Sequence, residues 1–350
     1  MSRSLATRAL RGAVAGRNIL ADPFFERLRS RGGRTLQLLG AQFRFRSNSA
    51  RLLELVDVAY AGLPRHRLGE PATKIEVGLL LGAGGGATRR PVPAALSLGN
   101  SASHLIGATP GSSLVIASAA QRTALVVVSP DMLAHPYHVR YEFIEFAVFT
   151  LAARVQGLVP LHAACVGHRG RGLLLIGGSG AGKSTLSMLW ALQGLDFLAE
   201  DSVFVAPATM AATGVANFLH VRPDSLRFVT VAAQARALRR SPLIRRRSGV
   251  QKLEIDLRQT GWRLARAPLD IAAIVFLTSE PAGRHRLLAP LSKAQLSRRT
   301  LHEQPYAAGR AEWPLFRGKL AAVPAFELRR GGHPLESVDA LRALLEANAG

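Results

Sequence analysis

The chain has 350 residues, 48% of them hydrophobic, which is enough for one large or two medium domains with a sizeable core. Its formal charge of +22 favours polyanionic partners, but the arginines are spread along the chain and no nucleic-acid-binding module is recognisable, so we expect no nucleic-acid partner. The single cysteine, Cys165, excludes a disulfide framework within the chain and indicates a buried, inert thiol in a reducing setting.

The N-terminal end is basic. Residues 1–20 contain four arginines and no acid, which is the composition of a transit peptide, but they lack the continuous apolar core of a secretory signal. We favour a basic, poorly ordered terminus over residues 1–30. The longest apolar stretch, 143–166, is interrupted by polar residues and falls short of the ~18 continuous residues of a membrane span. We therefore expect a cytoplasmic protein without a membrane partner.

Residues 31–135 have the patterns of a smaller α+β domain. Period-two alternation over 36–46 predicts one strand, and a helix is expected to follow Ser47 or Ser49. Further short strands are predicted at 75–81, 113–117 and 124–128. From its position alone, we expect this N-terminal domain to help recruit a substrate or partner.

The second predicted domain covers residues 136–350 and is of the α/β class. Helical apolar spacing runs from residue 138 to residue 155, and Gly157 and Pro160 end it, so the boundary falls near 135–158. Strands and one closing helix are expected further along the chain. The strands are at 161–166, 173–176, 197–205, 215–221, 252–257, 271–277 and 325–328, and the helix is at 337–347.

A complete phosphate-binding loop of the Walker A type lies between a predicted strand and a predicted helix. Its glycines let backbone N–H groups converge on a phosphate, and the following helix points its positive end at the same place. We expect Lys183 to reach the β- and γ-phosphates of ATP, and the Ser184 hydroxyl to hold Mg²⁺. A Gly-rich turn without a ligand is the alternative. The expected nucleotide-binding residues are Gly177, Gly178, Ser179, Gly180, Ala181, Gly182, Lys183, Ser184 and Thr185.

Two adjacent acids follow in the next apolar strand. Glu200 and Asp201 are costly to bury unless they are paired or bound to a metal, and a phosphate loop needs an acid nearby to complete the Mg²⁺ shell. One carboxylate can serve the metal while the other accepts a proton from an attacking hydroxyl. A hydrated strand end is the alternative. His162, in the strand before the loop, is a third candidate, with a satisfied core histidine as its alternative.

Three segments together carry a family resemblance: 161–164 (LHAA), 173–185 (LLLIGGSGAGKST) and 197–203 (FLAEDSV). They resemble the catalytic domain of bacterial HPr kinase/phosphorylase, and more closely the HPr-kinase-related kinases that accompany modified-peptide gene clusters. The likeness is sharp over about 160–206 and diffuse elsewhere, although 249–256 is also similar. It implies a P-loop serine kinase domain related to phosphoenolpyruvate carboxykinase.

The resemblance also implies roles for individual residues. It puts Lys183 on the phosphates, Ser184 on Mg²⁺, Glu200 in the place of the residue that activates the substrate hydroxyl, and Asp201 near the metal. His162 falls on the histidine of the strand before the loop. The HPr enzymes carry Asp where this chain has Gly178, paired aspartates at the two acids, and a downstream Glu-x-Arg-Gly signature that is not evident here. HPr itself and the reverse dephosphorylation are therefore not part of the expectation.

We expect an ATP-dependent kinase that phosphorylates a serine-type hydroxyl on a peptide or small protein, with Glu200 taking the proton. Two alternatives remain open: a kinase for a small acceptor such as free serine, and a nucleotide-responsive binding protein with little turnover. The HPr-type relatives leave a homo-oligomer open as well. Arg222, Lys252 and Glu254 are further candidates for phosphate or substrate contacts, with ordinary strand residues as the alternative.

Overall fold

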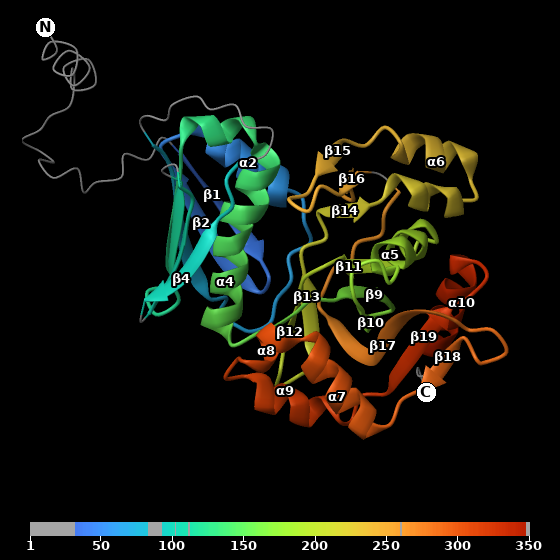
Figure 1. Cartoon of the computed structure of the whole chain (residues 1–350). Helices are drawn as coiled ribbons and strands as arrows, with labels where there is room; N and C mark the ends of the chain where they lie inside the picture. Colours follow the sequence, from blue (N-terminus) through green and yellow to red (C-terminus); the bar gives the residue numbers. More distant parts are fainter. Residues whose placement is uncertain (1–31, 83–92, 102, 111–112, 260, 348–350) are drawn as a thin grey trace, which may run out of the picture.

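The computed structural model describes residues 32–82, 93–101, 103–110, 113–259 and 261–347. The basic terminus predicted over residues 1–30 lies outside these ranges. The described part is a mixed α/β structure with several sheets (Figure 1). Within it, no helix combines the length and the apolar character needed to cross a membrane.

The first sheet is built from residues before 129. The prediction of one strand over 36–46 was wrong, because a turn at 39–40 divides this segment into two antiparallel strands. The second of them, β2 (Ala41–Ser47), alternates as predicted, with Phe43 and Phe45 buried and Arg44 and Arg46 exposed. Parallel pairing joins β2 to β3 and β3 to β7 in the middle of the sheet, and the other pairs are antiparallel. The strand order is β1 (Gly32–Leu38), β2, β3 (Lys74–Leu81), β7 (Thr123–Val128), β6 (Leu114–Ser118), β5 (His104–Ala108) and β4 (Ser97–Ser101).

Two helices cover this sheet and complete the first core. The predicted helix after Ser49 is confirmed as α2 (Ala50–Tyr60), and α4 (Glu145–Gln156) ends, as predicted, at Gly157 in the left-handed region with φ 62°. Both helices contact strands of the first sheet. Residues 139–153, expected in the second domain, thus pack with the first sheet, while the division into domains stays a prediction. Short turns precede α4: η1 (Pro130–Ala134), α3 (Pro136–His138) and the π-helical η2 (Val139–Ile144).

The second sheet places three strand ends at one edge. Strands β10 (Arg171–Ile176), β17 (Leu269–Pro281) and β19 (Ala325–Arg330) run parallel, so their carboxyl ends meet where a ligand can bind. The strand order is β11 (Asp196–Ala199), β9 (Ala164–His168), β10, β17, β13 (Ala211–Gly214), β12 (Val203–Ala206) and β8 (Val159–Leu161), with β19 beside β17 and β18 (Leu288–Pro290) beside β19.

Helices cover both faces of this sheet (Figure 1). Leu173 and Leu175 pack in one core with α5 (Lys183–Leu192) and α10 (Pro334–Ala347). Leu174 and Ile176 point to the opposite face, which α7 (Lys293–Glu303), α8 (Pro305–Ala308) and α9 (Trp313–Leu320) cover. Burial on both faces explains why β10 is a continuous apolar run rather than an alternating one. Cys165 is buried in the same core, as predicted.

The predictions of one strand at 161–166 and one at 197–205 were wrong in the same way. Each segment forms two strands, with breaks at 162–163 and 200–202. Strand β8 pairs with β12, and β9 pairs with β11, so the two breaks lie side by side. Only two residues join β8 to β9, although these strands lie towards opposite ends of the strand order. The sheet must therefore curl until its ends are close.

A third, small sheet lies beside α5. Its strand order is β14 (Phe218–Val221), β16 (Gln251–Asp256) and β15 (Leu243–Arg245), so the strands predicted at 215–221 and 252–257 are confirmed. The segment between β14 and β15 contains η3 (Pro223–Phe228) and α6 (Ala232–Leu238). Figure 1 shows this sheet between the helices of the first sheet and α5.

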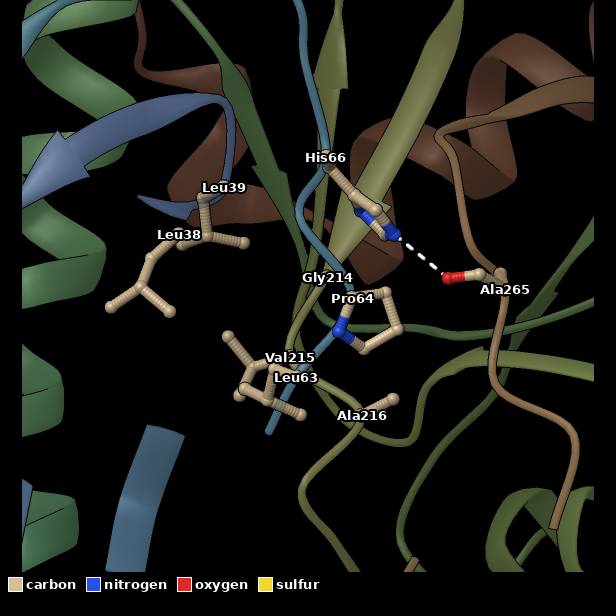
Figure 2. Close-up of a pocket in the computed structure, with 9 residues that line it drawn as sticks. All are labelled: Leu38, Leu39, Leu63, Pro64, His66, Gly214, Val215, Ala216 and Ala265. Atoms are coloured by element: carbon tan, nitrogen blue, oxygen red, sulfur yellow. Dashed lines mark hydrogen bonds between the residues drawn. The ribbon is translucent and has the colours of Figure 1, made fainter. Parts of the chain in front are cut away.

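The loop from α2 to β3 connects the first and second sheets through His66. This buried side chain contacts the Thr213 hydroxyl through Nδ1 at 2.7 Å. Figure 2 shows its other contact, from Nε2 to the Ala265 carbonyl at 2.9 Å. The carbonyl oxygen can only accept, so Nε2 donates to it. Burial lowers the pKa of the imidazole, so the ring is neutral near pH 7 and Nδ1 accepts from the hydroxyl. The adjoining cavity of about 10 Å³ is only large enough for about one water.

Candidate functional site

A cavity of about 750 Å³ opens at the carboxyl ends of β10, β17 and β19. Its walls come from the loop after β10, the strand ends at 277–279 and 328–332, the strands β14 and β16, and the turn between β15 and β16. This size is within the range of cavities that bind nucleotides and other small molecules. The position is the ligand-binding edge expected of parallel strands.

The predicted phosphate-binding loop forms one wall of the cavity. Gly180 and Gly182 have φ angles of 86° and 102°, which only glycine adopts without strain. A Cβ at Gly177 would lie 3.0 Å from the Leu277 carbonyl oxygen, so glycine also allows the loop to approach β17. Gly178, Gly180 and Gly182 all have open space at the Cβ position. The backbone of this loop is therefore accessible from the cavity.

The helix α5 begins directly after the loop. Its N-cap, Gly182, provides no side-chain cap, and the Leu186 N–H bonds the Gly182 carbonyl at 2.9 Å. The first N–H groups of a helix have no partner within the helix, and the helix dipole is positive at this end. Ser184 and Thr185, in this first turn, line the cavity. The loop and helix together form an arrangement suited to a phosphate group.

Lys183 is buried at the base of the loop. Its Nζ donates to the carbonyls of Gly177 at 2.5 Å and Gly178 at 3.5 Å. Burial lowers the pKa of the amine, although Asp201 and Glu200 act in the opposite direction. A buried cation beside an open glycine loop can exchange these weak carbonyl contacts for a phosphate oxygen.

Glu200 is buried and bonded to the first turn of α5. Its Oε1 accepts from the Ser184 hydroxyl at 2.5 Å, and its Oε2 accepts from the His220 backbone N–H at 2.9 Å. Burial would raise the pKa of this carboxyl, but the hydrogen bonds and charges of His220, Lys252 and Ser184 outweigh it and hold the pKa at about 2. Glu200 is therefore an ionised carboxylate next to the Ser184 hydroxyl.

Asp201 and His162 lie on the two neighbouring strand breaks and line the cavity. The Asp201 Oδ1 is 3.3 Å from the His162 Nδ1, and the two side chains are 41% and 58% exposed. The buried Gln304 fixes the His162 backbone, because it accepts from the His162 N–H at 2.8 Å and donates to the His162 carbonyl at 3.0 Å. This carboxylate–imidazole pair can reach a group that enters from solvent.

The structure brings all the predicted site residues together around one cavity. The cavity is lined by Lys183, Ser184, Asp201 and His162. Glu200 is not among the lining residues and contacts the Ser184 hydroxyl. The candidates Arg222 and Lys252 line the cavity too. The chemical roles of these residues stay predictions.

Sequence reasoning missed His220. It is buried between Glu200 and Glu254, with its Nδ1 3.3 Å from the Glu200 Oε2 and its Nε2 3.3 Å from the Glu254 Oε1. Burial lowers its pKa, but the two carboxylates raise it further, so the net shift is upward. His220 and Glu254 are cross-strand partners in β14 and β16. The available signal was a histidine in the otherwise apolar strand β14, but its pairing with Glu254 in β16 was not readable from the sequence.

The cavity is strongly basic. Among its described lining residues, seven are lysines or arginines and two are aspartates. The basic residues are Lys183, Arg222, Arg227, Arg246, Lys252, Arg329 and Arg330. Low-dielectric walls lined by one sign of charge concentrate ligands of the opposite sign. The cavity therefore has the electrostatics of a site for a polyphosphate.

The oxygen ligands of this site suit Mg²⁺ that protein and phosphates bind together, rather than a metal ion that protein side chains alone coordinate. In the part of the chain that the structure describes, no group of three or more His, Cys, Asp or Glu could hold a metal ion. Mg²⁺ is usually bound by one or two carboxylates or hydroxyls together with substrate phosphates and water. Ser184 and Glu200, in direct contact beside the phosphate loop, fit that pattern.

No protein-family model and no curated protein matches the chain. Among solved structures, the Hpr(Ser) kinase/phosphatase from Coxiella burnetii aligns with a TM-score of 0.31 and 11% sequence identity. The alignment covers 55% of this chain and 99% of that one. A likeness this weak carries no argument about fold or activity. The family resemblance of the sequence stays a prediction, and the functional argument rests on the geometry of the cavity.

Proposed function

We propose that this protein is an ATP-dependent kinase that transfers the γ-phosphoryl group to a serine-type hydroxyl of a peptide or small protein. The observation that carries the proposal is the contact of Ser184 with Glu200 at the start of α5, with Asp201 facing the cavity one residue later. A phosphate loop, a metal-side carboxylate and a second, accessible carboxylate are the parts that phosphoryl transfer requires.

We assign the binding of Mg²⁺ to Glu200 and Ser184, and we call this the metal-side role. These two residues would hold Mg²⁺, and the ion would supply neutralisation of the negative charge of the phosphate oxygens. Lys183 is suited to bind those oxygens, since it lies at the base of the loop and its present partners are two backbone carbonyls. The N–H groups at the start of α5 would orient the same phosphates.

We assign the role of proton acceptor to Asp201. This assignment exchanges the roles of Glu200 and Asp201 that the family resemblance implies. Glu200 is 6% exposed with both oxygens bonded, whereas Asp201 is 41% exposed and lines the cavity. In the transfer step, the acceptor oxygen forms a bond to the γ-phosphorus as the bond from that phosphorus to the β–γ bridging oxygen breaks. The hydroxyl proton passes to Asp201, and ADP leaves. His162 would orient the Asp201 carboxylate.

The exposure of Asp201 and His162 favours a large acceptor. A small molecule needs a closed site, whereas a hydroxyl on a peptide chain can approach an open pair of side chains. We propose a cytoplasmic setting because the only cysteine is buried and unpaired. A role in a modified-peptide pathway remains part of the proposal.

The test is a transfer assay with ATP radiolabelled in the γ-phosphoryl group. The full chain is incubated with MgATP and parallel panels of serine-containing peptides and free hydroxy amino acids. We expect label on peptides, and none with Lys183→Met. The control is Lys319→Met, which changes an exposed lysine on α9 outside the cavity. Label on small acceptors alone would contradict the peptide assignment, and bound ATP without any phosphoproduct would contradict the kinase.

A further inference from the structure

We propose that Glu142 and Arg247 are positioning residues that hold the β15–β16 hairpin across the cavity, so that Arg246 and Lys252 face the phosphate loop. The effect on nucleotide rests on the proposed function, whereas the restraint on the hairpin does not. Glu142 lies in η2, which precedes the α4 helix of the first sheet, and Arg247 is at the tip of the hairpin. The first sheet would thereby contribute to a site that it does not line.

Arg247 joins the hairpin tip to the first part of the chain through several hydrogen bonds. Its Nε donates to the Glu142 Oε1 at 2.6 Å, and its Nη2 donates to the Glu142 Oε2. The same guanidinium donates to the Pro93 carbonyl at 2.7 Å and to the Ala94 carbonyl at 3.0 Å. A two-pronged arginine–carboxylate pair fixes direction as well as distance.

The Glu142 carboxylate is itself held in place. The His138 Nδ1 contacts the Glu142 Oε1 at 2.8 Å, one helical turn earlier. Burial opposes ionisation, but the hydrogen bonds of His138 and Arg247 lower the pKa of this carboxyl. Glu142 is therefore charged near neutral pH and is a fixed acceptor for the arginine.

A second contact joins the same helical segment to the base of the hairpin. The Arg140 Nη2 donates to both Glu254 oxygens, at 3.0 and 2.9 Å, and both side chains are 8% exposed. Between Arg140 and Glu142, the Tyr141 hydroxyl is 3.1 Å from the His220 Nε2. Three successive residues thus contact the third sheet.

The local helix type is consistent with this concentration of contacts. Residues 139–144 form a π-helical turn, which is rare and frequent at functional sites. The wider turn reduces the rotation between successive side chains, so Arg140, Tyr141 and Glu142 can all reach one neighbouring sheet. The turn is thus part of the connection between the first and third sheets.

Arg246 and Lys252 are the charges that this connection brings to the cavity. The Arg246 Nη1 lies 3.8 Å from the Asp201 Oδ2, and the Lys252 Nζ lies 3.8 Å from the Glu200 Oε1. Both distances exceed a hydrogen bond. The buried Arg246 Nε has no hydrogen-bond partner among the described residues. The two cations are therefore close to the acids of the site without being fully engaged by them.

The restraint on Arg247 reaches the cavity through its sequence neighbour, Arg246. Arg246 and Arg247 are neighbours at a turn in which the Arg246 N–H bonds the Val250 carbonyl at 3.0 Å and Gly249 has φ 81°. The Arg247 side chain points to Glu142 in η2, whereas the Arg246 side chain lines the cavity. Release of Arg247 would free the tip that carries Arg246 and loosen the start of β16, where Lys252 lies, while Arg140 still holds Glu254 further along the strand. A displacement of about 1 Å in a catalytic group can lower a rate ~100-fold.

Hydrogen exchange tests the restraint without any nucleotide. We expect Arg247→Ala to speed amide exchange over residues 246–252 at least about tenfold, with β10 and α5 unchanged. Arg245→Ala is the matched control, because it removes an exposed arginine two residues away on the same hairpin. The charge-exchanged pair Glu142→Arg with Arg247→Glu should restore much of the protection. Unchanged exchange over 246–252 in Arg247→Ala would overturn the proposal.

Lysine labelling tests the consequence for the site. The side chains of Lys183 and Lys252 both line the cavity, so a small reagent that enters it can reach both amines. We expect MgATP to protect both lysines from a small amine-reactive reagent in the wild type, and to protect only Lys183 in Arg247→Ala. The charge-exchanged pair should again protect Lys252.

The outcomes separate the two proposals. If MgATP protects Lys183 but never Lys252, or if Lys252 stays protected in a loosened Arg247→Ala hairpin, the positioning role is overturned. If neither lysine is protected in the wild type, the proposed nucleotide site fails. In that case the hydrogen exchange of residues 246–252 alone decides whether Glu142 and Arg247 restrain the hairpin.

Discussion

Glu200 and Asp201 are adjacent in sequence and have different environments. The Glu200 side chain is 6% exposed and bonded to Ser184, while the Asp201 side chain is 41% exposed and faces the cavity. The break at 200–202 separates the two acids from the strands on either side. Burial with hydrogen bonds favours a permanently ionised metal-side group, and exposure beside His162 favours a group that exchanges protons.

Glu200→Gln should weaken MgATP binding by about 10–100-fold, because it removes a charge beside the metal-side hydroxyl. Binding of ATP in the presence of EDTA should change far less. Calorimetric titration of both ligands measures the difference. Asp224→Asn, which changes an exposed acid that lines the cavity, is the control and should leave both affinities within about threefold. Equal losses with and without Mg²⁺ would contradict the metal-side assignment.

At the scale of elements, the site depends on the paired breaks β8/β9 and β11/β12. Gly214, in β13, packs where β11 ends: a Cβ there would lie 2.5 Å from the Ala199 Cβ and 3.0 Å from the Leu198 carbonyl oxygen. These neighbours directly precede Glu200. The absence of a side chain at Gly214 therefore lets β13 pack against the segment that carries both acids.

Gly214→Ala should destabilise the protein by about 1–3 kcal/mol, because the overpacked methyl group must displace backbone. It should also weaken MgATP binding through the shifted Glu200. Urea unfolding and calorimetry measure the two effects. Gly99→Ala in β4 is the control, since a Cβ there meets open space and alanine is no worse than glycine in a strand. A Gly214→Ala variant as stable as the control would refute the packing argument.

Local sequence signals predicted the loop before α5, most strands, and the helices α2, α4, α5 and α10, but not α6, α7 or α9. The phosphate loop is local, since its glycines, Lys183 and Ser184 are contiguous. The breaks at 162–163 and 200–202 were missed because apolar residues continue on both sides of them, and only the pairing of β8 with β12 and of β9 with β11 defines them. The contacts of Arg140 and Glu142 with the third sheet join residues more than 100 positions apart, so no local pattern could predict them.

At the scale of the molecule, three structural parts meet at the cavity. The second sheet supplies the phosphate loop and the acids, the third sheet supplies Lys252 and His220, and η2 connects the third sheet to the first. The loop between α2 and β3 adds a separate connection through His66, which contacts Thr213 and Ala265. Phe204 of β12 also packs in the first core, and Asn217 donates to the Ala59 carbonyl at 2.9 Å, so several contacts join the first sheet and its helices to the rest of the described chain.

The His66 contact should make stability depend on pH. Burial lowers the pKa of this imidazole, against the smaller opposite effect of the Ala265 carbonyl. Below about pH 6.5 the unfolded chain then binds a proton that the folded chain does not, so stability falls as the pH falls. Urea unfolding between pH 7.5 and pH 5 should show a larger loss for the wild type than for His66→Gln.

The matched control for this pH series is His285→Gln, which changes an exposed histidine. It should lose stability with falling pH to the same extent as the wild type. Parallel curves for the wild type and His66→Gln would mean that the imidazole is not buried in its neutral form, contrary to the hydrogen bonds described for it.

The central claim is that Asp201 faces a phosphate loop that holds MgATP, and that it accepts the proton of the acceptor hydroxyl. The most direct measurement compares Asp201→Asn with the wild type in MgATP affinity and in the single-turnover rate of γ-phosphoryl transfer. We predict an affinity within about threefold of the wild type and a transfer rate reduced by ~10²–10⁴-fold. An Asp201→Asn variant that transfers phosphoryl at the wild-type rate would contradict the account.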